Sequence, residues 1–377
     1  MLQLTPALDQ GGVERGTIDV ARALAEAGGR ALVASRGGRM EGQLARAGGR
    51  LIRLAVGAKA PWAIRANARR LAEIVFAERV DVIHARSRAP AWAGWLAARA
   101  TGAAFVTTWH GVYRENAPLK RLWNGVMAKG RPTIAVSTFI AEHVLARHPG
   151  AEVVTIPRGV DLARFSPEAV TGARTAGLAA RWGLVESPRH VVLLPGRLTR
   201  WKGQTVFVDA AARLRALRGA DDVTLLMVGD DPGSAFGREL AARAARLGVG
   251  DLMQLAGHCD DMPAALKLAS VVVSASTEPE AFGRVPIEAQ AMGRPVVATA
   301  HGGARETVAE GETGFLVPPG DPSALAEAID RALSLDPGER AAMAHAGRAR
   351  AAARFSLAAM TGATLGAYAR AARRARA

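Results

Sequence analysis

Residues 274–303 read SASTEPEAFGRVPIEAQAMGRPVVATAHGG, and the architecture is easiest to recognise from this stretch. The apolar run VVV at 271–273 leads into it and predicts a buried strand. A polar loop follows, then a helix expected to begin near Pro286 and to end at Gly293, and then a second strand over 295–298. A parallel sheet built from such units presents free N–H groups at the helix start, and this geometry suits a phosphate.

Two carboxylates accompany this turn. Glu280 lies in the loop and Glu288 in the first turn of the expected helix, so both can face the same crevice. The hydroxyl groups of a sugar or a ribose need acceptors of this kind. Acidic residues are also common at helix starts, because the helix dipole favours negative charge there. From this stretch alone, a ligand site and an ordinary helix start both stay open.

The bulk composition narrows the class of protein. A length of 377 residues accommodates two domains of ordinary size. The single cysteine, Cys259, excludes a disulfide within the chain and a cysteine-based metal site. No stretch approaches the roughly 18 apolar residues of a membrane span, and the first residues do not resemble a signal peptide. These features predict a cytoplasmic protein.

The formal net charge of +15 is concentrated in the first half of the chain. Up to residue 164 there are 24 Lys and Arg against 12 Asp and Glu, whereas the remainder has 25 against 22. A basic first half predicts an anionic partner. An anionic inner-membrane surface fits better than nucleic acid, because no nucleic-acid motif is present. An arginine-rich composition without any such partner is the alternative.

Strand and helix patterns alternate through the first half, which predicts a doubly wound parallel sheet. The first strand–helix turn carries Gly11-Gly12, without the GxGxxG spacing of a dinucleotide fingerprint. Two strands end in histidines. His84 is expected to be structural, and His110, which precedes a basic aromatic loop, to belong to a site. Ser137 also follows a strand, where capping a helix is its common use.

The segment 116–129 predicts a helix with an apolar stripe flanked by basic residues. Leu119 and Leu122 lie on the stripe, beside Lys120 and Arg121. Such a helix is typical of membrane interfaces, and it is equally typical of a helix packed in a protein. Both interpretations stay open.

A domain boundary is expected near residue 166, and a second doubly wound unit starts with VVLLPGRLTRWKG at 191–203. Gly196 and Gly203 frame Arg197 and Lys202 in the loop after its first strand. Two cations in a glycine-bounded loop at a strand end predict a diphosphate clamp.

Another strand end carries His258 and Cys259, followed by two aspartates. No second group of ligands has suitable spacing, so no metal site is expected.

These motifs together resemble the retaining glycosyltransferases of family 4, over essentially the whole chain. The signature is the pair Glu280 and Glu288 with Phe282-Gly283 between them. Arg197 and Lys202 match the basic pair of that family. Gly11-Gly12 matches its N-terminal phosphate-side loop, and His110-Gly111 its sugar-side turn.

The resemblance implies an α/β protein of the GT-B fold, with two Rossmann-like, doubly wound parallel-sheet domains facing a central cleft. Residues 1–165 would form an N-terminal acceptor-side domain. Residues 166–350 would form a C-terminal domain that binds the nucleotide sugar. Residues 351–377 would form a helix that packs back on the N-terminal domain.

The resemblance also implies roles for individual residues. The donor is a nucleoside-diphosphate sugar, and the implied catalytic residues are His110, Arg197, Lys202 and Glu280. Arg197 and Lys202 neutralise the leaving diphosphate, while Glu280 holds sugar hydroxyls, Glu288 binds the ribose and His110 lies beneath the anomeric carbon. The implied donor-binding residues are Gly12, Gly196, Arg197, Lys202, His258, Cys259, Met262, Glu280, Phe282, Gly283, Arg284, Val285 and Glu288; those of the acceptor side are Glu14 and Ser137.

In this family the acceptor hydroxyl is thought to attack from the face that the diphosphate leaves, with a phosphate oxygen as base. No metal and no cofactor is therefore expected besides the nucleotide sugar, which is a substrate. The basic first domain suggests a lipid-linked or glycan acceptor of lipopolysaccharide or cell-envelope biosynthesis, met at the cytoplasmic face of the inner membrane. One departure is Arg158 in IPRGVD, where relatives often carry asparagine.

Two other functions remain as alternatives. One is a sugar-nucleotide-binding protein without catalytic activity. The other is a sugar-nucleotide epimerase of the same fold, although that class uses carboxylates and histidines for proton transfer and does not show this glutamate pair.

Overall fold

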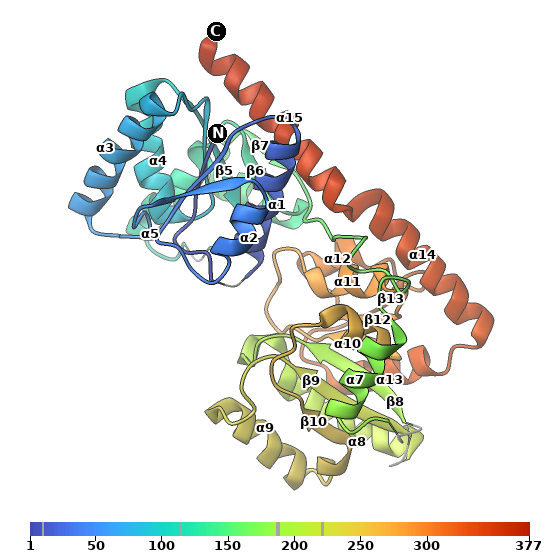
Figure 1. Cartoon of the computed structure of the whole chain (residues 1–377). Helices are drawn as coiled ribbons and strands as arrows, with labels where there is room; N and C mark the ends of the chain where they lie inside the picture. The colour runs from blue at the N-terminus through green and yellow to red at the C-terminus, as the bar shows by residue number, and fades with distance from the viewer. Residues whose placement is uncertain (10, 114, 186–188, 220–221) are drawn as a thin grey trace. The chain divides into compact units, whose positions relative to one another are not determined.

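The computed structural model describes residues 1–9, 11–113, 115–185, 189–219 and 222–377. The chain divides into two compact units. Unit 1 comprises Met1–Gly159 and Leu357–Ala377, and unit 2 comprises Val160–Ser356. Each unit is built on one parallel sheet with helices on both faces (Figure 1). The prediction of two Rossmann-like, doubly wound units is confirmed.

Unit 1 contains a seven-stranded sheet in the order β3-β2-β1-β4-β5-β6-β7, and the pairing of every neighbouring strand is parallel. Helices cover both faces, which is why its central strands read as apolar runs rather than as alternating patterns. The strands are β1 (Leu2–Leu4), β2 (Ala31–Ser35), β3 (Gly49–Arg53), β4 (Val82–Ala85), β5 (Ala104–Trp109), β6 (Thr133–Ala135) and β7 (Val153–Thr155).

The two faces of this sheet are covered by helices from distant parts of the chain. α1 and the last helix, α15, pack together on one face (Figure 1), where Val82 and Val106 meet Met360 and Tyr368. α4 packs on the other face, and α3 packs on α4. The helices are α1 (Gly12–Glu26), α2 (Glu41–Arg46), α3 (Pro61–Ala77), α4 (Arg88–Thr101), α5 (Pro118–Gly125), the 3-10 helix η1 (Val126–Lys129), α6 (Thr138–Arg147) and α15 (Leu357–Arg376).

Unit 2 contains a six-stranded parallel sheet in the order β10-β9-β8-β11-β12-β13. The strands are β8 (His190–Pro195), β9 (Val223–Val228), β10 (Met253–Leu255), β11 (Val271–Ser274), β12 (Val296–Thr299) and β13 (Gly314–Val317). The helices are α7 (Gly172–Arg181), α8 (Gln204–Arg218), α9 (Ala235–Arg246), α10 (Met262–Leu268), α11 (Arg284–Ala291), α12 (Ala304–Thr307), α13 (Pro322–Leu333) and α14 (Pro337–Phe355), with the 3-10 helices η2 (Arg200–Lys202) and η3 (Gly250–Leu252).

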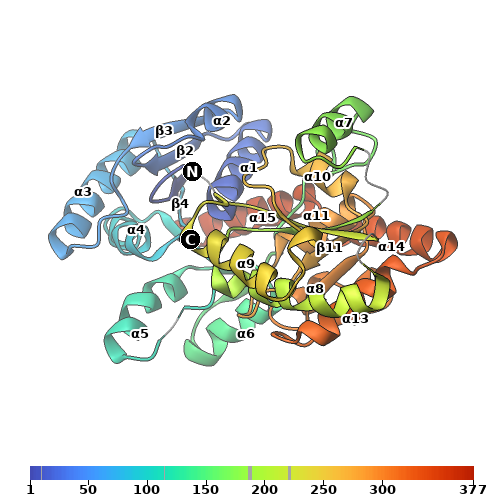
Figure 2. The same cartoon turned by 90° about the horizontal axis from the view of Figure 1, so that it is seen from below.

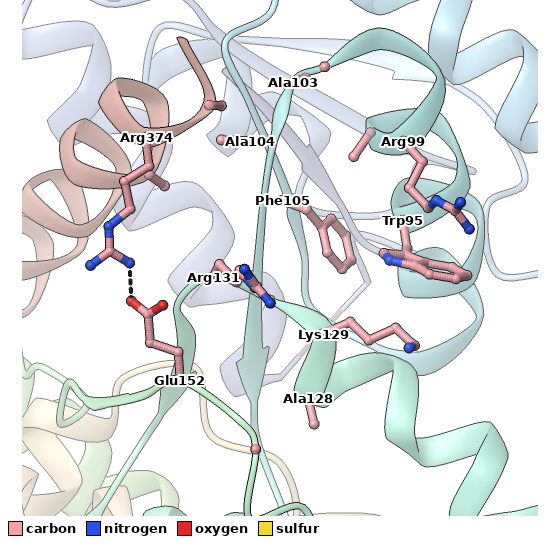
Figure 3. Close-up of a pocket in the computed structure, with 16 residues that line it drawn as sticks. Trp95, Arg99, Ala103, Ala104, Phe105, Ala128, Lys129, Arg131, Glu152 and Arg374 are labelled. Carbon is pink, nitrogen blue, oxygen red and sulfur yellow. Dashed lines mark hydrogen bonds and ion pairs between the residues drawn. The ribbon is translucent and has the colours of Figure 1, made fainter. Parts of the chain in front are cut away.

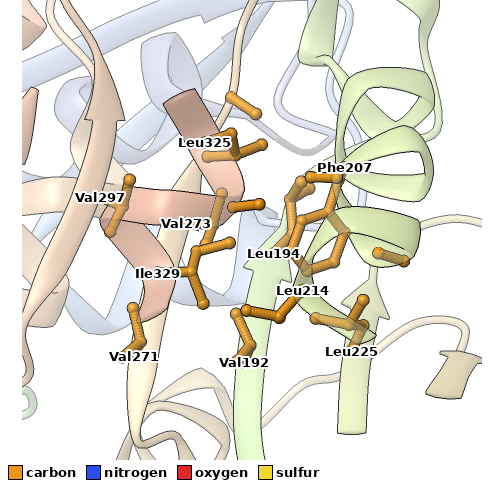
Figure 4. Close-up of a cluster of buried hydrophobic side chains, with 14 of the residues drawn as sticks. Val192, Leu194, Phe207, Leu214, Leu225, Val271, Val273, Val297, Leu325 and Ile329 are labelled. Atoms are coloured by element: carbon orange, nitrogen blue, oxygen red, sulfur yellow. The ribbon is translucent and has the colours of Figure 1, made fainter. Parts of the chain in front are cut away.

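The core of unit 2 lies under α8 and α13, which run side by side over one face of the sheet (Figure 2). Strand residues such as Val192 and Val273 point toward Phe207 of α8 and Ile329 of α13 (Figure 4). Burying a side chain of this size contributes roughly 1.5–3 kcal/mol to the free energy of unfolding. This packed layer holds the strands of unit 2 in place beneath the loops that follow them.

The segment 116–129 differs from the single helix that its pattern predicts. α5 begins at Pro118, where proline is well tolerated, and the chain tightens into η1 after Gly125. As a result, Val126 and Met127 are buried, whereas Leu119 and Leu122 of α5 are 79% and 65% exposed. The apolar stripe is therefore divided between the core of unit 1 and its surface.

Candidate active site

The strand order of unit 2 reverses between β8 and β11, which are neighbours in the sheet although distant in sequence. Open parallel sheets bind ligands at such a point, beyond the carboxyl ends of the two strands. The loop after β8 carries Arg197 and Lys202, and the loop after β11 carries Glu280. The sequence motifs of unit 2 therefore meet where this fold class places its ligands.

Lys202 and Glu280 are in direct contact. The Lys202 Nζ donates a hydrogen bond to Glu280 Oε1 at 2.8 Å, and both side chains are largely buried, with 17% and 16% of their surface exposed. The same carboxylate oxygen accepts a hydrogen bond from the Ser276 hydroxyl at 2.5 Å. The Lys202 ammonium also lies 4.4 Å from the centre of the Trp201 ring, a cation–π distance. A cation and a carboxylate are thus held side by side at the switch point.

Gly203 allows the two loops to come this close. Its φ is +77°, a conformation that favours glycine, and a Cβ atom at this position would lie 1.8 Å from the carbonyl oxygen of Ala275. The Thr277 N–H also donates to the Trp201 carbonyl at 2.7 Å, across the same contact. The glycine that the sequence marked only as a loop boundary therefore sets the distance between Lys202 and Glu280.

Helix α11 begins at Arg284, two residues before the expected start near Pro286. Gly283 precedes it with a φ of +79°, and Pro286 occupies the first turn, where a missing N–H breaks no helical bond. The prediction that Glu288 lies in the first turn is therefore wrong. Glu288 lies one turn further along the helix. Its carboxylate forms an ion pair with the Arg284 guanidinium, with the nitrogen and oxygen atoms 2.7 Å apart.

The start of α11 has no side-chain cap. The N–H groups of Arg284 and Val285 point out of the first turn, where no acceptor within the helix can reach them. Together with the positive end of the helix dipole, they form an arrangement that favours an anion.

Arg197 follows Gly196 at the end of β8, and its side chain is exposed. The Arg197 carbonyl accepts a hydrogen bond from the Gln204 side chain at 2.7 Å, and the Leu198 N–H donates to Asp230 Oδ2 at 3.0 Å. The loop is therefore fixed by its backbone while the guanidinium of Arg197 stays accessible. Among the residues that the structure describes, no carboxylate pairs with this guanidinium.

Phe282 does not present its side chain to a ligand. It is 4% exposed, and its ring packs edge-on against that of Phe355 at 5.6 Å between the ring centres. The side chain of Phe282 is therefore not available for the donor contact that the resemblance implies. The aromatic ring instead anchors the loop that carries Glu280 and Gly283.

His258 and Cys259 lie on the connection between β10 and α10, and Met262 is the first residue of α10. The His258 side chain is exposed and contacts Asp260 at 2.9 Å, whereas Cys259 is buried and burial raises the pKa of its thiol. Asp261 caps α10 and pairs with Arg174 at 2.6 Å, which lowers the pKa of Asp261. Within the described ranges, no group of three or more His, Cys, Asp or Glu is arranged to hold a metal ion.

In unit 1, His110 directly follows β5. Its Nε2 atom is buried and has no hydrogen-bond partner among the described residues. Burial holds the pKa of His110 well below its usual value, and the positive charges of Arg158 and Arg86 lower this pKa further. His110 is therefore a neutral imidazole at neutral pH.

The phosphate-side turn of unit 1 lies at the start of α1. Gly12 is the first residue of this helix, and its carbonyl accepts a hydrogen bond from the Arg158 guanidinium. Glu14 lies in the first turn and reaches back to Gly11, where a Cβ atom would be 2.6 Å from its carboxylate. Burial raises the pKa of Glu14. Arg158, which the sequence left without a role, thus ties the end of β7 to this turn.

Two residues at strand ends have structural roles. Both ring nitrogens of His84 are used inside unit 1, Nδ1 with the Tyr368 hydroxyl at 2.5 Å and Nε2 with Thr108 Oγ1 at 2.7 Å. Ser137 is buried and caps α6 by accepting from the Ile140 N–H at 3.1 Å. The structural role expected for His84 is confirmed. For Ser137 the structure shows the capping role.

Three residues near these loops were not singled out from the sequence. Ser276 bonds Glu280, and the His301 Nε2 contacts the Ser276 carbonyl at 2.8 Å. Arg86 follows β4, is 3% exposed and donates to Gln3 at 2.9 Å, while one of its terminal nitrogens has no partner among the described residues. Their positions directly after strands are the signal that could have identified them.

No helix within the described ranges has the length and apolar character needed to cross a membrane. Surface contact with a membrane is a different property, and it depends on exposed side chains such as those of α5.

Two protein-family models match the chain in succession. Residues 10–164 match the model described as Glycosyltransferase Family 4, and residues 189–335 match the model described as Glycosyl transferases group 1. The first match lies mainly in unit 1, and the second lies within unit 2.

The chain is also similar in sequence and structure to known glycosyltransferases. A D-inositol 3-phosphate glycosyltransferase of Salinispora tropica is 34% identical over 296 residues, which cover 73% of this chain and 61% of that protein's length. A glycosyltransferase of Rickettsia africae is 37% identical with a TM-score of 0.90, over 98% of this chain and 97% of that one. HepE of Anabaena, whose structure was solved with UDP, is 25% identical with a TM-score of 0.82, over 98% of this chain and 99% of that one. The chain therefore belongs to the family 4 glycosyltransferases.

Proposed function

We propose that the protein is a retaining, metal-independent glycosyltransferase that moves a sugar from a nucleoside-diphosphate sugar to a hydroxyl acceptor. The observation that carries this proposal is the contact of 2.8 Å between Lys202 and Glu280, beside the uncapped start of α11. One edge of the unit 2 sheet thus combines a cation and free N–H groups for a diphosphate with a carboxylate for sugar hydroxyls. The binding of UDP by HepE supports a nucleotide sugar as donor.

In the proposed reaction, the bond between the anomeric carbon and the β-phosphate oxygen breaks. The acceptor oxygen bonds to the same carbon from the same face, and its proton passes to a phosphate oxygen. Lys202 and Arg197 offset the charge that develops on the diphosphate, which is often the largest contribution to catalysis. Lys202 would leave Glu280 and form an ion pair with the diphosphate. Glu280 would keep its hydrogen bond from Ser276 and accept further hydrogen bonds from sugar hydroxyls.

His110 is proposed to lie beneath the anomeric carbon of the bound donor. Its low pKa supports this role, because a neutral imidazole does not repel the positive charge of an oxocarbenium-like transition state. Glu288 is proposed to bind the ribose hydroxyls, and its ion pair with Arg284 fixes the carboxylate on α11.

The acceptor is proposed to be a membrane glycolipid or a precursor of lipopolysaccharide or another cell-envelope polysaccharide, used at the cytoplasmic face of the inner membrane. Support comes from α5, where the exposed Leu119 and Leu122 are one turn apart and flank the exposed Lys120 and Arg121. An exposed apolar pair beside basic side chains is typical of helices that bind an anionic membrane surface.

The roles of Lys202 and Glu288 can be tested with labelled UDP- and GDP-sugars, by measuring the release of nucleoside diphosphate and the transfer to an acceptor. We expect Lys202→Ala and Glu288→Ala each to lower kcat/KM by about 100-fold or more, because each removes a charge that binds the donor. Circular dichroism and thermal unfolding check that the variants fold.

The matched control is the exposed ion pair between Arg213 and Glu327, also on unit 2, with its atoms 3.3 Å apart. Arg213→Ala and Glu327→Ala should retain near-normal turnover, because exposed pairs contribute little. Near-normal turnover in both Lys202→Ala and Glu288→Ala would falsify the assignment. A wild-type protein that binds the donor but releases no diphosphate would be a binding protein, and conversion of the nucleotide sugar without its cleavage would indicate an epimerase.

A further inference from the structure

Unit 1 contains a cavity of about 810 Å³ at the edge of its sheet where the strands begin. Its walls come from the end of α4, the connection from η1 to β6, the residues before β7 and the last turns of α15. Figure 3 shows Arg131 between the Arg374–Glu152 pair on one side and Trp95 with Lys129 on the other. The volume lies within the range of ligand pockets, about 300–1,000 Å³.

The cavity is distinct from the candidate active site. Ala104, in its lining, is the first residue of β5, and Trp109 is the last residue of this strand, immediately before His110. A strand rises about 3.3 Å per residue, so the two ends of β5 are roughly 17 Å apart. A ligand in this cavity would therefore not touch His110.

The charges of the lining are strongly unequal. Four cationic side chains, those of Arg99, Lys129, Arg131 and Arg374, face the cavity with the single carboxylate of Glu152. That carboxylate is already paired with Arg374, at 2.5 Å. Among the residues that the structure describes, none of the other three cations has a carboxylate partner. The lining therefore carries a positive charge that the protein itself does not neutralise.

Part of this charge has a local explanation. α4 and η1 both end at the cavity, and Arg99 and Lys129 lie in their last turns, where cations offset the negative end of a helix. Both cations also lie over the Trp95 ring, at 5.2 Å and 4.7 Å from its centre. Neither explanation applies to Arg131, which follows η1 and faces the same space.

We propose that this cavity binds a phosphate-bearing anion with an uncharged ring, such as a sugar phosphate. The planar guanidinium of Arg131 and the ammonium of Lys129 suit phosphate oxygens. Phe105 and Trp95 provide apolar surface beside them for the ring. The phosphate can be that of a free sugar phosphate or that of an anionic lipid headgroup, and the two sources are separable by experiment.

Isothermal titration calorimetry with glucose 6-phosphate tests the free phosphomonoester, with glucose as the uncharged control. We expect binding that weakens with added salt and that falls at least about tenfold in Lys129→Gln/Arg131→Gln. The double variant Arg65→Gln/Arg69→Gln removes two exposed cations of α3 in the same unit and should leave the affinity unchanged. Lys202→Ala should also bind normally, because the cavity is separate from the donor site.

Sedimentation with phosphatidylglycerol vesicles tests the lipid headgroup. Vesicle binding that is lost in Lys129→Gln/Arg131→Gln but kept in Arg65→Gln/Arg69→Gln would assign the phosphate to a lipid. The proposal is overturned if glucose 6-phosphate fails to bind at about 10 mM and vesicle binding does not depend on Lys129 and Arg131. It is also overturned if Lys202→Ala loses the binding of glucose 6-phosphate and Lys129→Gln/Arg131→Gln keeps it. That outcome would contradict the cavity proposal without contradicting the proposed donor site.

Discussion

Lys202 and Glu280 show how two side chains can hold each other ready for a ligand. Their contact neutralises both charges in a largely buried position, where an isolated charge would be costly. In the proposed reaction, an incoming diphosphate would take the place of Glu280 beside Lys202, while Ser276 would keep its hydrogen bond to Glu280. When the pair opens in this way, Lys202 would face the diphosphate and Glu280 would retain a hydrogen-bond donor.

The two histidines at strand ends in unit 1 predict how stability depends on pH. Burial keeps the pKa of His84 and His110 well below the usual value of about 6.5 in the folded protein. Below that pH the unfolded chain binds protons that the folded chain does not. The free energy of unfolding should therefore be constant near pH 7.5 and fall below about pH 6.5, by up to about 1.4 kcal/mol per pH unit for each histidine.

Urea unfolding measured between pH 7.5 and 5.5 checks this prediction. His110→Gln should reduce the slope, whereas His345→Gln, at an exposed position of α14, should not. A free energy of unfolding that stays flat down to pH 5.5 would show that both imidazoles take up protons as easily in the folded state.

At the scale of secondary structure, α5 carries the prediction about membranes. Leu119→Ser/Leu122→Ser should reduce binding to phosphatidylglycerol vesicles several-fold, because it removes the exposed apolar pair. Lys120→Gln/Arg121→Gln should reduce it mainly at low salt, because screening weakens the basic contribution. Cosedimentation at two salt concentrations measures both effects.

The control for α5 is Leu145→Ser on α6, where one leucine of the same unit is 42% exposed. This variant should bind vesicles normally. If wild-type protein binds neither anionic nor neutral vesicles, or binds both equally at high salt, peripheral attachment through α5 is wrong.

The sequence predicted most strands and that they run parallel, because buried strands in such sheets are apolar runs bounded by glycines and polar loops. The sequence pattern predicted helices less well where tertiary packing or backbone conformation decides where they begin. α7 lies in a stretch rich in alanine and glycine, whose residue pattern does not specify a helix, although Thr171 caps it. The start of α11 was misplaced because Gly283 begins the helix through a backbone conformation that composition does not specify.

The sequence predicted which residues form the candidate site better than it predicted the contacts between them. Arg197, Lys202, Glu280 and Glu288 were identified from spacing and resemblance, and the first three lie on the two loops at the switch point. The burial of the Phe282 ring and the contact of Lys202 with Glu280 depend on tertiary packing. Ser276 was missed for the same reason, since its importance arises only from the side chain that it touches.

At the scale of the whole molecule, the two units differ in how the chain builds them. Unit 2 is one continuous stretch, Val160–Ser356, whereas unit 1 needs Leu357–Ala377 as well as Met1–Gly159. We expect a fragment of residues 160–356 to unfold cooperatively by itself. A fragment of residues 1–159 should be unstable, because it lacks the side chains of α15 that bury one face of its sheet.

Adding a peptide of residues 357–377 to the 1–159 fragment should restore cooperative unfolding, as measured by circular dichroism. The matched peptide with Tyr368→Ala should restore less, because Tyr368 fills the core beside His84 and bonds its ring. Cooperative unfolding of the 1–159 fragment without any peptide would contradict the assignment of α15 to its core.

The discontinuity of unit 1 has a consequence for the order of events on the ribosome. Translation at about 5–20 residues per second makes the roughly 200 residues of unit 2 in about 10–40 s, and only then does the segment that forms α15 emerge. During that interval the nascent first 159 residues leave the apolar face centred on Val82 and Val106 without its cover. The part of the polypeptide made first should therefore mature last, and it is the part for which chaperones would compete.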